Sequence, residues 1–209
     1  MTVDVALRQL LLKLGPELPA LDLNRFAGRI GARWGSSLGG VLQDGSYEVY
    51  TEGLRFDSRD GLVWSGGDTR VSLAEYRPGQ TLGALRLQDI DLAVLADLAR
   101  YLPLSTQTHQ ALRGYAPQGR IERLQANWQG SSGAMPDRYE AEGRVSGLEV
   151  AAQDASEGAT VGMAGRATPG VAGLSVDFNL NQDGGSAKIQ LRQGYVEWPG
   201  LFEPARLAV

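Results

Sequence analysis

Turn-forming residue pairs recur at short intervals along this chain, and they constrain its fold more than any other feature. Between the turns, segments such as 46–51, 54–56 and 71–73 alternate apolar with polar residues. A period of two is typical of strands that have one apolar and one polar face. The first half therefore predicts strands joined by tight turns. The turn pairs are Gly39-Gly40, Asp44-Gly45, Asp60-Gly61 and Gly66-Gly67.

The second half carries the same pattern more clearly. Segment 174–180 places four apolar residues on one face, with polar residues between them. A Gly-rich stretch follows over 181–185, and 187–191 alternates again, so we expect a β-hairpin. Further strands are expected at 119–128 and 138–150. Between them and the hairpin, segment 151–169 is small, polar and Gly-rich, which predicts a mobile loop.

Three segments depart from the strand pattern and predict short helices. In 91–102 the leucines recur every three or four residues, and Asp91 stands where the N-cap is needed. A second helix is expected over 105–114, with Ser105 as its N-cap. Residues 4–14 have apolar residues at mostly three- and four-residue steps before a Gly-Pro pair, so they predict an N-terminal helix.

Composition excludes several classes of function. The chain has 20 Lys and Arg against 24 Asp and Glu, a formal net charge of -4, and its basic residues are scattered, so nucleic acid is not an expected partner. It has no cysteine, and His109 is its only histidine, which leaves no ligand set for a zinc site. No Gly-x-Ser-x-Gly motif accompanies His109, which we interpret as an exposed helix residue. We therefore expect no enzyme, no metal and no cofactor.

Two further candidates have simpler explanations. Asp89 and Asp91 could form a carboxylate pair on one face of a strand, but capping of the following helix explains Asp91 better. The four tryptophans, together with the seven tyrosines, could stack on sugars, but each falls at or beside a strand pattern, where an aromatic side chain usually packs. No apolar run approaches the roughly 18 residues of a membrane helix. The start Met1-Thr2-Val3-Asp4 lacks the charged and apolar regions of a signal peptide, so none is expected in this sequence.

The apolar strand faces leave two architectures open. Two strand layers could pack face to face as a sandwich about 10 Å apart. Alternatively, one sheet could curl without closing and leave a trough lined by Leu, Val, Ile and Phe. Both arrangements predict the same alternation, so periodicity alone does not choose between them.

An ordered series of turns and strand ends runs through the second half of the chain. Its order resembles that of the AsmA-like, YhdP-type family of large Gram-negative envelope proteins, and none of its motifs marks an active site. The motifs are residues 87–92, 115–124, Trp128, 136–141, 148–150, 169–174, 183–185 and Val196-Glu197-Trp198-Pro199-Gly200-Leu201-Phe202.

The resemblance implies a mainly β fold with a few short helices: a curled, taco-like antiparallel sheet with a hydrophobic groove, interrupted by a helical pair near 91–114. It also implies a relation to bridge-like lipid-transfer proteins that carry phospholipid between the inner and outer membranes. The parent protein would then be periplasmic and anchored in the inner membrane. Because the chain is short and shows no anchor, we expect it to be an internal fragment of that parent.

The resemblance favours the trough over the packed core, and the sequence then divides into four segments of one continuous body. These are an N-terminal helix and lead-in over 1–18, a first β-segment over 19–90, the helical insertion over 91–114 and a second β-segment over 115–209. Nine residues are expected to line the groove. They are Leu174, Val176, Phe178, Leu180, Ile189 and Leu191, with Leu85, Leu87 and Val49.

An alternative function belongs to another class. The chain could be a structural or assembly module of the envelope that binds protein through its strand edges and carries no lipid. Because unpaired strand edges invite pairing, a fragment of this kind could also associate with itself. The expected partners are thus phospholipid, the rest of the parent chain and, at the edges, another copy.

Overall fold

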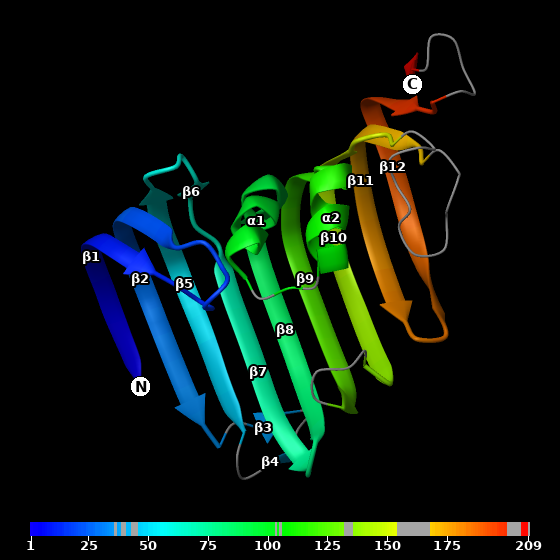
Figure 1. The fold of residues 1–209 in the computed structure, drawn as a ribbon. Helices are drawn as coiled ribbons and strands as arrows, with labels where there is room; N and C mark the ends of the chain where they lie inside the picture. The colour runs from blue at the N-terminus through cyan, green and yellow to red at the C-terminus, as the bar shows by residue number, and fades with distance from the viewer. Residues whose placement is uncertain are drawn as a thin grey trace.

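The chain folds into one large, curled antiparallel sheet with two short α-helices on one face, as the computed structural model shows (Figure 1). Its main sheet has 11 strands in the part of the chain that the structure describes. The strand order is β1-β2-β5-β7-β8-β9-β10-β11-β12-β13, and β6 pairs with β5. The predicted fold class is therefore confirmed. The described residues are 1–35, 37–38, 41–42, 46–102, 104, 106–131, 136–153, 168–199 and 206–208.

The elements follow one another mostly as hairpins, and the helices enter between two neighbouring strands. The first strands are β1 (Thr2–Leu12), β2 (Leu21–Trp34), β5 (Tyr47–Ser58), β6 (Val63–Trp64), β7 (Asp68–Arg77) and β8 (Gln80–Asp91), with the small β3 (Ser37–Leu38) and β4 (Val41–Leu42) forming a separate pair. The helical part comprises α1 (Leu92–Leu98), the 3-10 turn η1 (Ala99–Tyr101) and α2 (Thr106–Tyr115). The last strands are β9 (Gln118–Ser131), β10 (Arg138–Val150), β11 (Gly170–Asn181), β12 (Gly184–Glu197) and β13 (Arg206–Ala208).

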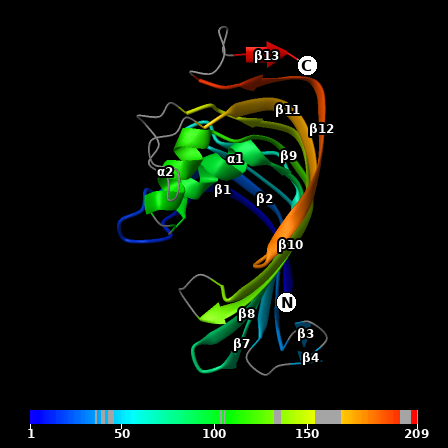
Figure 2. The same ribbon diagram turned by 90° about the vertical axis from the view of Figure 1, so that its right-hand side faces the viewer.

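Bulges in the ladders bend the strands. The β2–β5 pairing shifts register between Leu23 and Arg25 and again between Ala27 and Arg29, and Gly53 has φ 56° at the second shift. The β9–β10 and β10–β11 ladders also shift. An extra residue on one strand bends it and increases its twist. The strands accordingly curve into an arc, and α1 and α2 lie on its concave side near one end (Figure 2).

The hairpin predicted around the Gly-rich stretch is confirmed. Strands β11 and β12 pair antiparallel from Asn181 opposite Gly184 back to Gly170 opposite Glu197. The helix expected from 91 is also present, as α1 and η1 together. Asp91 caps it, because its Oδ1 accepts hydrogen bonds from the backbone N–H groups of Ala93 and Val94 at 3.0 and 3.2 Å.

The N-terminal helix expected over 4–14 is wrong, because residues 4–12 lie in the edge strand β1, which ends at Leu12. Gln9 explains the error: it has φ 57°, and the ladder to β2 continues on either side of it. That local twist changes the phase of the alternation, so apolar residues before and after it fall at helix-like intervals. Pairing with β2 then decides the conformation, as tertiary context often does for short apolar segments.

Several expectations fall partly or wholly outside the described residues. These are the N-cap role of Ser105, the Gly39-Gly40 and Asp44-Gly45 turns, and most of the loop expected over 151–169, of which only the two ends are described. The sheet itself passes continuously through the expected β-segments. The division of the chain at residues 18, 90 and 114 stays a prediction.

The hydrophobic core is local and lies between the helices and one end of the sheet. Partly buried α1 residues, including Leu95 and Leu98, pack against it. Phe56 stacks on Trp64 with ring centroids 5.7 Å apart. The helices thus supply the second layer that the sheet needs at this end. The buried members are Leu21, Leu23, Phe56, Leu62, Trp64, Leu87, Ile90, Tyr101 and Ile121.

Replacing the helix cap tests how far α1 depends on it. We expect Asp91→Ala to lower the free energy of unfolding by about 1 kcal/mol, because two backbone N–H groups lose their acceptor. Asp97→Ala is the matched control, since Asp97 lies on the same helix and only its backbone carbonyl accepts a hydrogen bond, from Arg100. Urea unfolding followed by circular dichroism measures both. Equal effects of the two substitutions would contradict the assigned cap.

Candidate functional site

The strand register sorts the side chains into two faces of opposite character. We call the face that contacts α1 the inner face and the opposite one the outer face. On the inner face, apolar and small residues stand in cross-strand rows. The first row is Val49, Val71, Leu85, Ala126, Ala141 and Leu180, and the second is Thr51, Thr69, Leu87, Leu124, Gly143, Phe178 and Ala187.

Two shorter rows continue the inner face toward the helix-covered end of the later strands. The third row is Ile121, Val145, Val176 and Ile189, and the fourth is Leu148, Leu174 and Leu191. The four rows together contain all nine residues that the sequence analysis singled out. Val49, Leu85 and Leu180 share the first row, although more than 130 residues separate the first from the last. Their predicted contact with lipid is a separate matter and stays a prediction.

Other members of the same rows were not among the residues predicted from the sequence. Val71, Leu124, Ala126, Ala141 and Val145 occupy inner-face positions between the predicted ones. All of them lie at alternating positions of expected strands, which was the available signal. Their neighbours across the sheet depend on register, and the bulges that set register leave little trace in the sequence.

The inner face is only partly covered. Leu87, beneath the helices, is 9% exposed, whereas Val49 is 43%, Leu180 42% and Ile189 61% exposed. The described residues form one other sheet, the small β3–β4 pair. Val49 lies near the start of β5, Leu180 beside the β11–β12 turn and Ile189 on β12, and the row members between them, such as Val71 and Leu85, are partly exposed. A contiguous apolar surface of this kind, left partly open to solvent, marks a binding surface.

The outer face is polar and carries ion pairs across neighbouring strands. Arg29 on β2 bonds Asp4 on β1 at 2.9 Å and Glu52 on β5 at 3.3 Å. These partners, Asp4 first, raise the pKa of Arg29 above its ordinary value. Arg144 likewise meets Asp177 of β11 at 2.8 Å and Glu122 of β9 at 2.9 Å. Exposed pairs add little stability, but their charged groups favour contact of this face with water rather than with an apolar layer.

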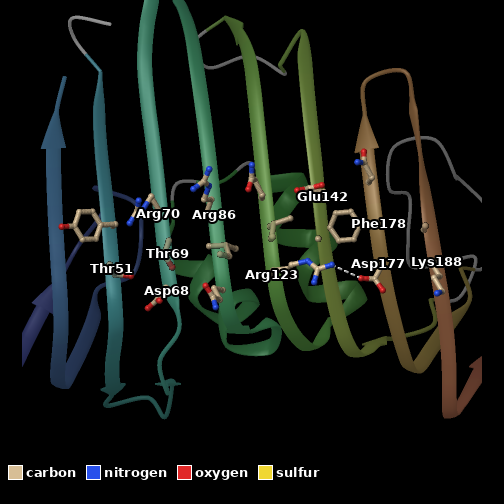
Figure 3. Close-up of a pocket in the computed structure, with 18 of the residues that line it drawn as sticks. Thr51, Asp68, Thr69, Arg70, Arg86, Arg123, Glu142, Asp177, Phe178 and Lys188 are labelled. Atoms are coloured by element: carbon tan, nitrogen blue, oxygen red, sulfur yellow. Dashed lines mark hydrogen bonds and ion pairs between the residues drawn. The ribbon is translucent and has the colours of Figure 1, made fainter. Parts of the chain in front are cut away.

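A hollow of about 850 Å³ crosses the middle of the sheet from β5 to β12 (Figure 3). Most of its lining residues precede or follow a member of the second row in sequence, as Arg86 and Gln88 flank Leu87 and as Asp177 and Asn179 flank Phe178. Because side chains alternate along a strand, these polar side chains belong to the outer face, so the hollow lies over that face and the strands of the second row form its floor. Figure 3 labels the charged neighbours, among them Arg123, which pairs with Asp177 at 3.4 Å.

A hydrogen-bonded cluster fastens the helical segment to the sheet. The carboxylate of Asp60, in the turn between β5 and β6, accepts hydrogen bonds from the hydroxyls of Ser58 and Tyr101. Arg100 lies 3.7 Å from the same carboxylate. The hydrogen bonds from Ser58 and Tyr101 lower the pKa of Asp60, while burial raises the pKa of Tyr101. We call Ser58, Asp60 and Tyr101 the latch.

The residues weighed for catalysis have structural contacts. His109 lies on α2 as expected, but it is half-buried rather than exposed, and its Nε2 lies 3.0 Å from the backbone oxygen of Ala99. Asp89 pairs with Arg120 at 2.6 Å, whereas Asp91 caps α1, so the two do not act as a carboxylate pair. No group of three or more His, Cys, Asp or Glu among the described residues could hold a metal ion.

The geometry defines a class of protein: an open antiparallel β-sheet that curls around an incompletely covered apolar face. A family model described as YhdP protein matches residues 1–208 of the chain. The chain therefore belongs to the YhdP family, as the resemblance indicated. Neither a curated protein nor a solved structure matches it significantly. Within the described residues, none of the helices has the length and apolar character needed to cross a bilayer.

Removing one hydroxyl tests the latch. We expect Tyr101→Phe to lower the free energy of unfolding by about 1 kcal/mol, since the ring stays and one hydrogen bond is lost. The carboxylate of Asp60 has a lowered pKa in the folded state, so its contribution is present above its ordinary pKa and is lost as the pH falls below about 4. The stability of the unmodified protein should therefore fall more steeply in acid than that of the variant.

Urea unfolding between neutral pH and pH of about 3 measures this difference. Tyr139→Phe serves as the control, because Tyr139 lies on β10, away from the latch. Parallel stability curves for the unmodified protein and Tyr101→Phe would contradict the proposed role of the latch.

Proposed function

We propose that this chain is a non-catalytic part of a periplasmic protein that moves phospholipid between the inner and outer membranes of the Gram-negative envelope. The parent protein would be held at the inner membrane by an anchor elsewhere in its sequence. The observation that carries the proposal is the inner face: four register rows of apolar and small residues run across the sheet, and they stay partly exposed outside the part that the helices cover. Membership of the YhdP family supports it.

Acyl chains suit this surface because burying them needs no directional contacts. Each CH₂ group removed from water contributes about 0.8 kcal/mol. The rows offer similar aliphatic surface from one strand to the next, so a bound chain loses little free energy when it shifts along them. Eight of the nine residues first identified would line the path, whereas the ninth, Leu87, is buried beneath the helices at its end. The eight are Leu174, Val176, Phe178, Leu180, Ile189, Leu191, Leu85 and Val49.

The alternative function also has a specific observation behind it. Strand β1 pairs only with β2 among the described residues, so its other edge has no strand partner there. Met1, Leu7 and Leu11 on or beside this edge are large and exposed. An edge of this kind recognises a further strand through backbone hydrogen bonds. An assembly module would use that edge and leave the inner face empty.

A matched pair of neighbouring residues tests the lipid path. Leu180 belongs to the first inner row. Asn179, the residue before it, lies on the outer face opposite Glu142 and Ser186. We expect Leu180→Asp to retain the fold, because this side chain is exposed, and to reduce retained phospholipid about tenfold or more, since a carboxylate against an acyl chain lacks compensation. Asn179→Asp adds the same charge and should leave retention unchanged. Native mass spectrometry of gently purified protein measures both.

The same experiment needs a position where a charge must disrupt folding. Leu87→Asp should unfold the protein, since this side chain is buried beneath the helices. If Leu180→Asp retains as much phospholipid as Asn179→Asp while both stay folded, the inner face is not the lipid path and the proposal fails.

A charged edge separates the two functions. Ala6 is an exposed residue of β1 that stands opposite Ala27. We expect Ala6→Lys to leave phospholipid retention unchanged, because it lies in the edge strand, outside the four inner rows. An assembly module that binds through this edge would instead lose its protein partner or its self-association. Native mass spectrometry and analytical ultracentrifugation of the same sample distinguish these results.

A further inference from the structure

Four aromatic side chains of the inner face stand in a single cross-strand row that the function above does not use. We call it the aromatic row. Sequence analysis treated its members as ordinary packing residues, but Trp34 is 75%, Tyr47 43% and Tyr139 38% exposed. In strand order the row reads Trp34, Tyr47, Leu73, Gly83, Trp128 and Tyr139.

We call the two margins of the inner face, where the strands end, the lips of the sheet. The aromatic row borders the first apolar row at the lip that lies away from the helices. It stands two residues farther from the helices than the first row: Tyr47 lies two residues before Val49 on β5, and Gly83 lies two residues before Leu85 on β8. From the second row, at Leu87, the distance along the strand is about 13 Å. On β2, β5 and β10 the row lies at the first, second or last residue of the strand, whereas β7, β8 and β9 continue for three or four residues beyond it. Figure 1 shows that these ends of the strands lie opposite α1 and α2. Six strands contribute, so the row extends about 24 Å across the sheet.

The central ring of the row is held flat against the sheet. A Cβ at Gly83 would collide with the indole of Trp128, so this pair depends on glycine. The indole thereby covers the backbone of β8 instead of projecting away from it. At Gly83 the row therefore has no side chain of its own, and the Trp128 indole occupies that place on the sheet.

The two lips of the sheet differ in what they can accommodate. At one lip the helices cover the inner face, and the latch of Ser58, Asp60 and Tyr101 holds them to the sheet. At the other lip indole and phenol rings stand next to aliphatic rows and remain exposed. Such rings combine an apolar body with one polar group, and they concentrate where hydrocarbon meets water.

We infer that the aromatic row marks the level of the ester and headgroup region of a bound phospholipid, with its acyl chains directed from this row toward α1. The inference rests on the proposed function and adds the orientation of the lipid to it.

A sugar is the other ligand that aromatic rings stack on. The neighbouring first row is wholly apolar, from Val49 to Leu180, and offers no side-chain hydrogen bond to sugar hydroxyls, so the surroundings favour an amphiphile.

Quenching of Trp128 fluorescence by nitroxide-labelled lipid tests the orientation. Trp34→Phe with Trp198→Phe leaves Trp64 and Trp128 as reporters. Adding Trp128→Phe to that background gives the blank, because Trp64 is buried and stacked on Phe56. The probes are phosphatidylcholine with the nitroxide on its headgroup and phosphatidylcholine with the nitroxide near the end of one acyl chain. We expect the headgroup probe to quench the Trp128 component severalfold more than the chain-end probe.

Each other outcome overturns a defined part of the argument. Stronger quenching by the chain-end probe would reverse the orientation and overturn the inference. No quenching by either probe, with phosphatidylcholine still bound in native mass spectrometry, would overturn the inference and leave the proposed function standing. No bound lipid at all would remove the proposed function itself. A Trp128 emission change with a soluble N-acetylglucosamine oligomer, without lipid binding, would assign the row to sugar stacking.

Discussion

The continuous antiparallel ladder is the constraint on which the rest of this structure depends. Because side chains alternate along each strand, a shared register carries one apolar face across the sheet from β5 to β12. A slip of one residue in any ladder would place arginines and aspartates on that face. Ion pairs between neighbouring strands, such as Arg29 with Asp4 and Arg144 with Asp177, are weak individually but oppose such a slip.

The second determinant is how little of the apolar face the chain covers. A globular domain would close this face with another layer. Here α1, η1 and α2 cover one end, where Leu87, Ile90 and Ile121 are buried. The latch from Asp60 to Tyr101 fixes that cover in place. Leu180, toward the opposite ends of the strands, and Ile189, farther across the sheet on β12, stay exposed. The molecule thus combines a small packed core, which supports folding, with an open apolar surface that can accept hydrocarbon.

The two lips give the open surface a direction. Helices close one lip, while rings such as Trp34 and Tyr139 border the other. A surface that was equally apolar at both lips would hold an amphiphile in either orientation. Unequal lips allow the polar end of a ligand to remain in water on one side only. The aromatic lip can then set the orientation of the bound ligand, while the uniform aliphatic rows permit its movement along the sheet.

Local sequence patterns were enough to predict the strand-rich class, the helical insertion, the β11–β12 hairpin and the Asp91 cap, because these depend on periodicity, turn residues and one side-chain hydrogen bond. They also identified nine apolar positions that share one face. The tertiary structure decided what alternation leaves open. Pairing with β2 made residues 2–12 a strand despite their helix-like spacing, since Gln9 changes the phase of the alternation. Bulges set which residues became neighbours, placing Val49 in one row with Leu180, and strand curvature decided that the apolar face stays partly open. These outcomes depend on contacts between residues far apart in the chain, which no local pattern encodes.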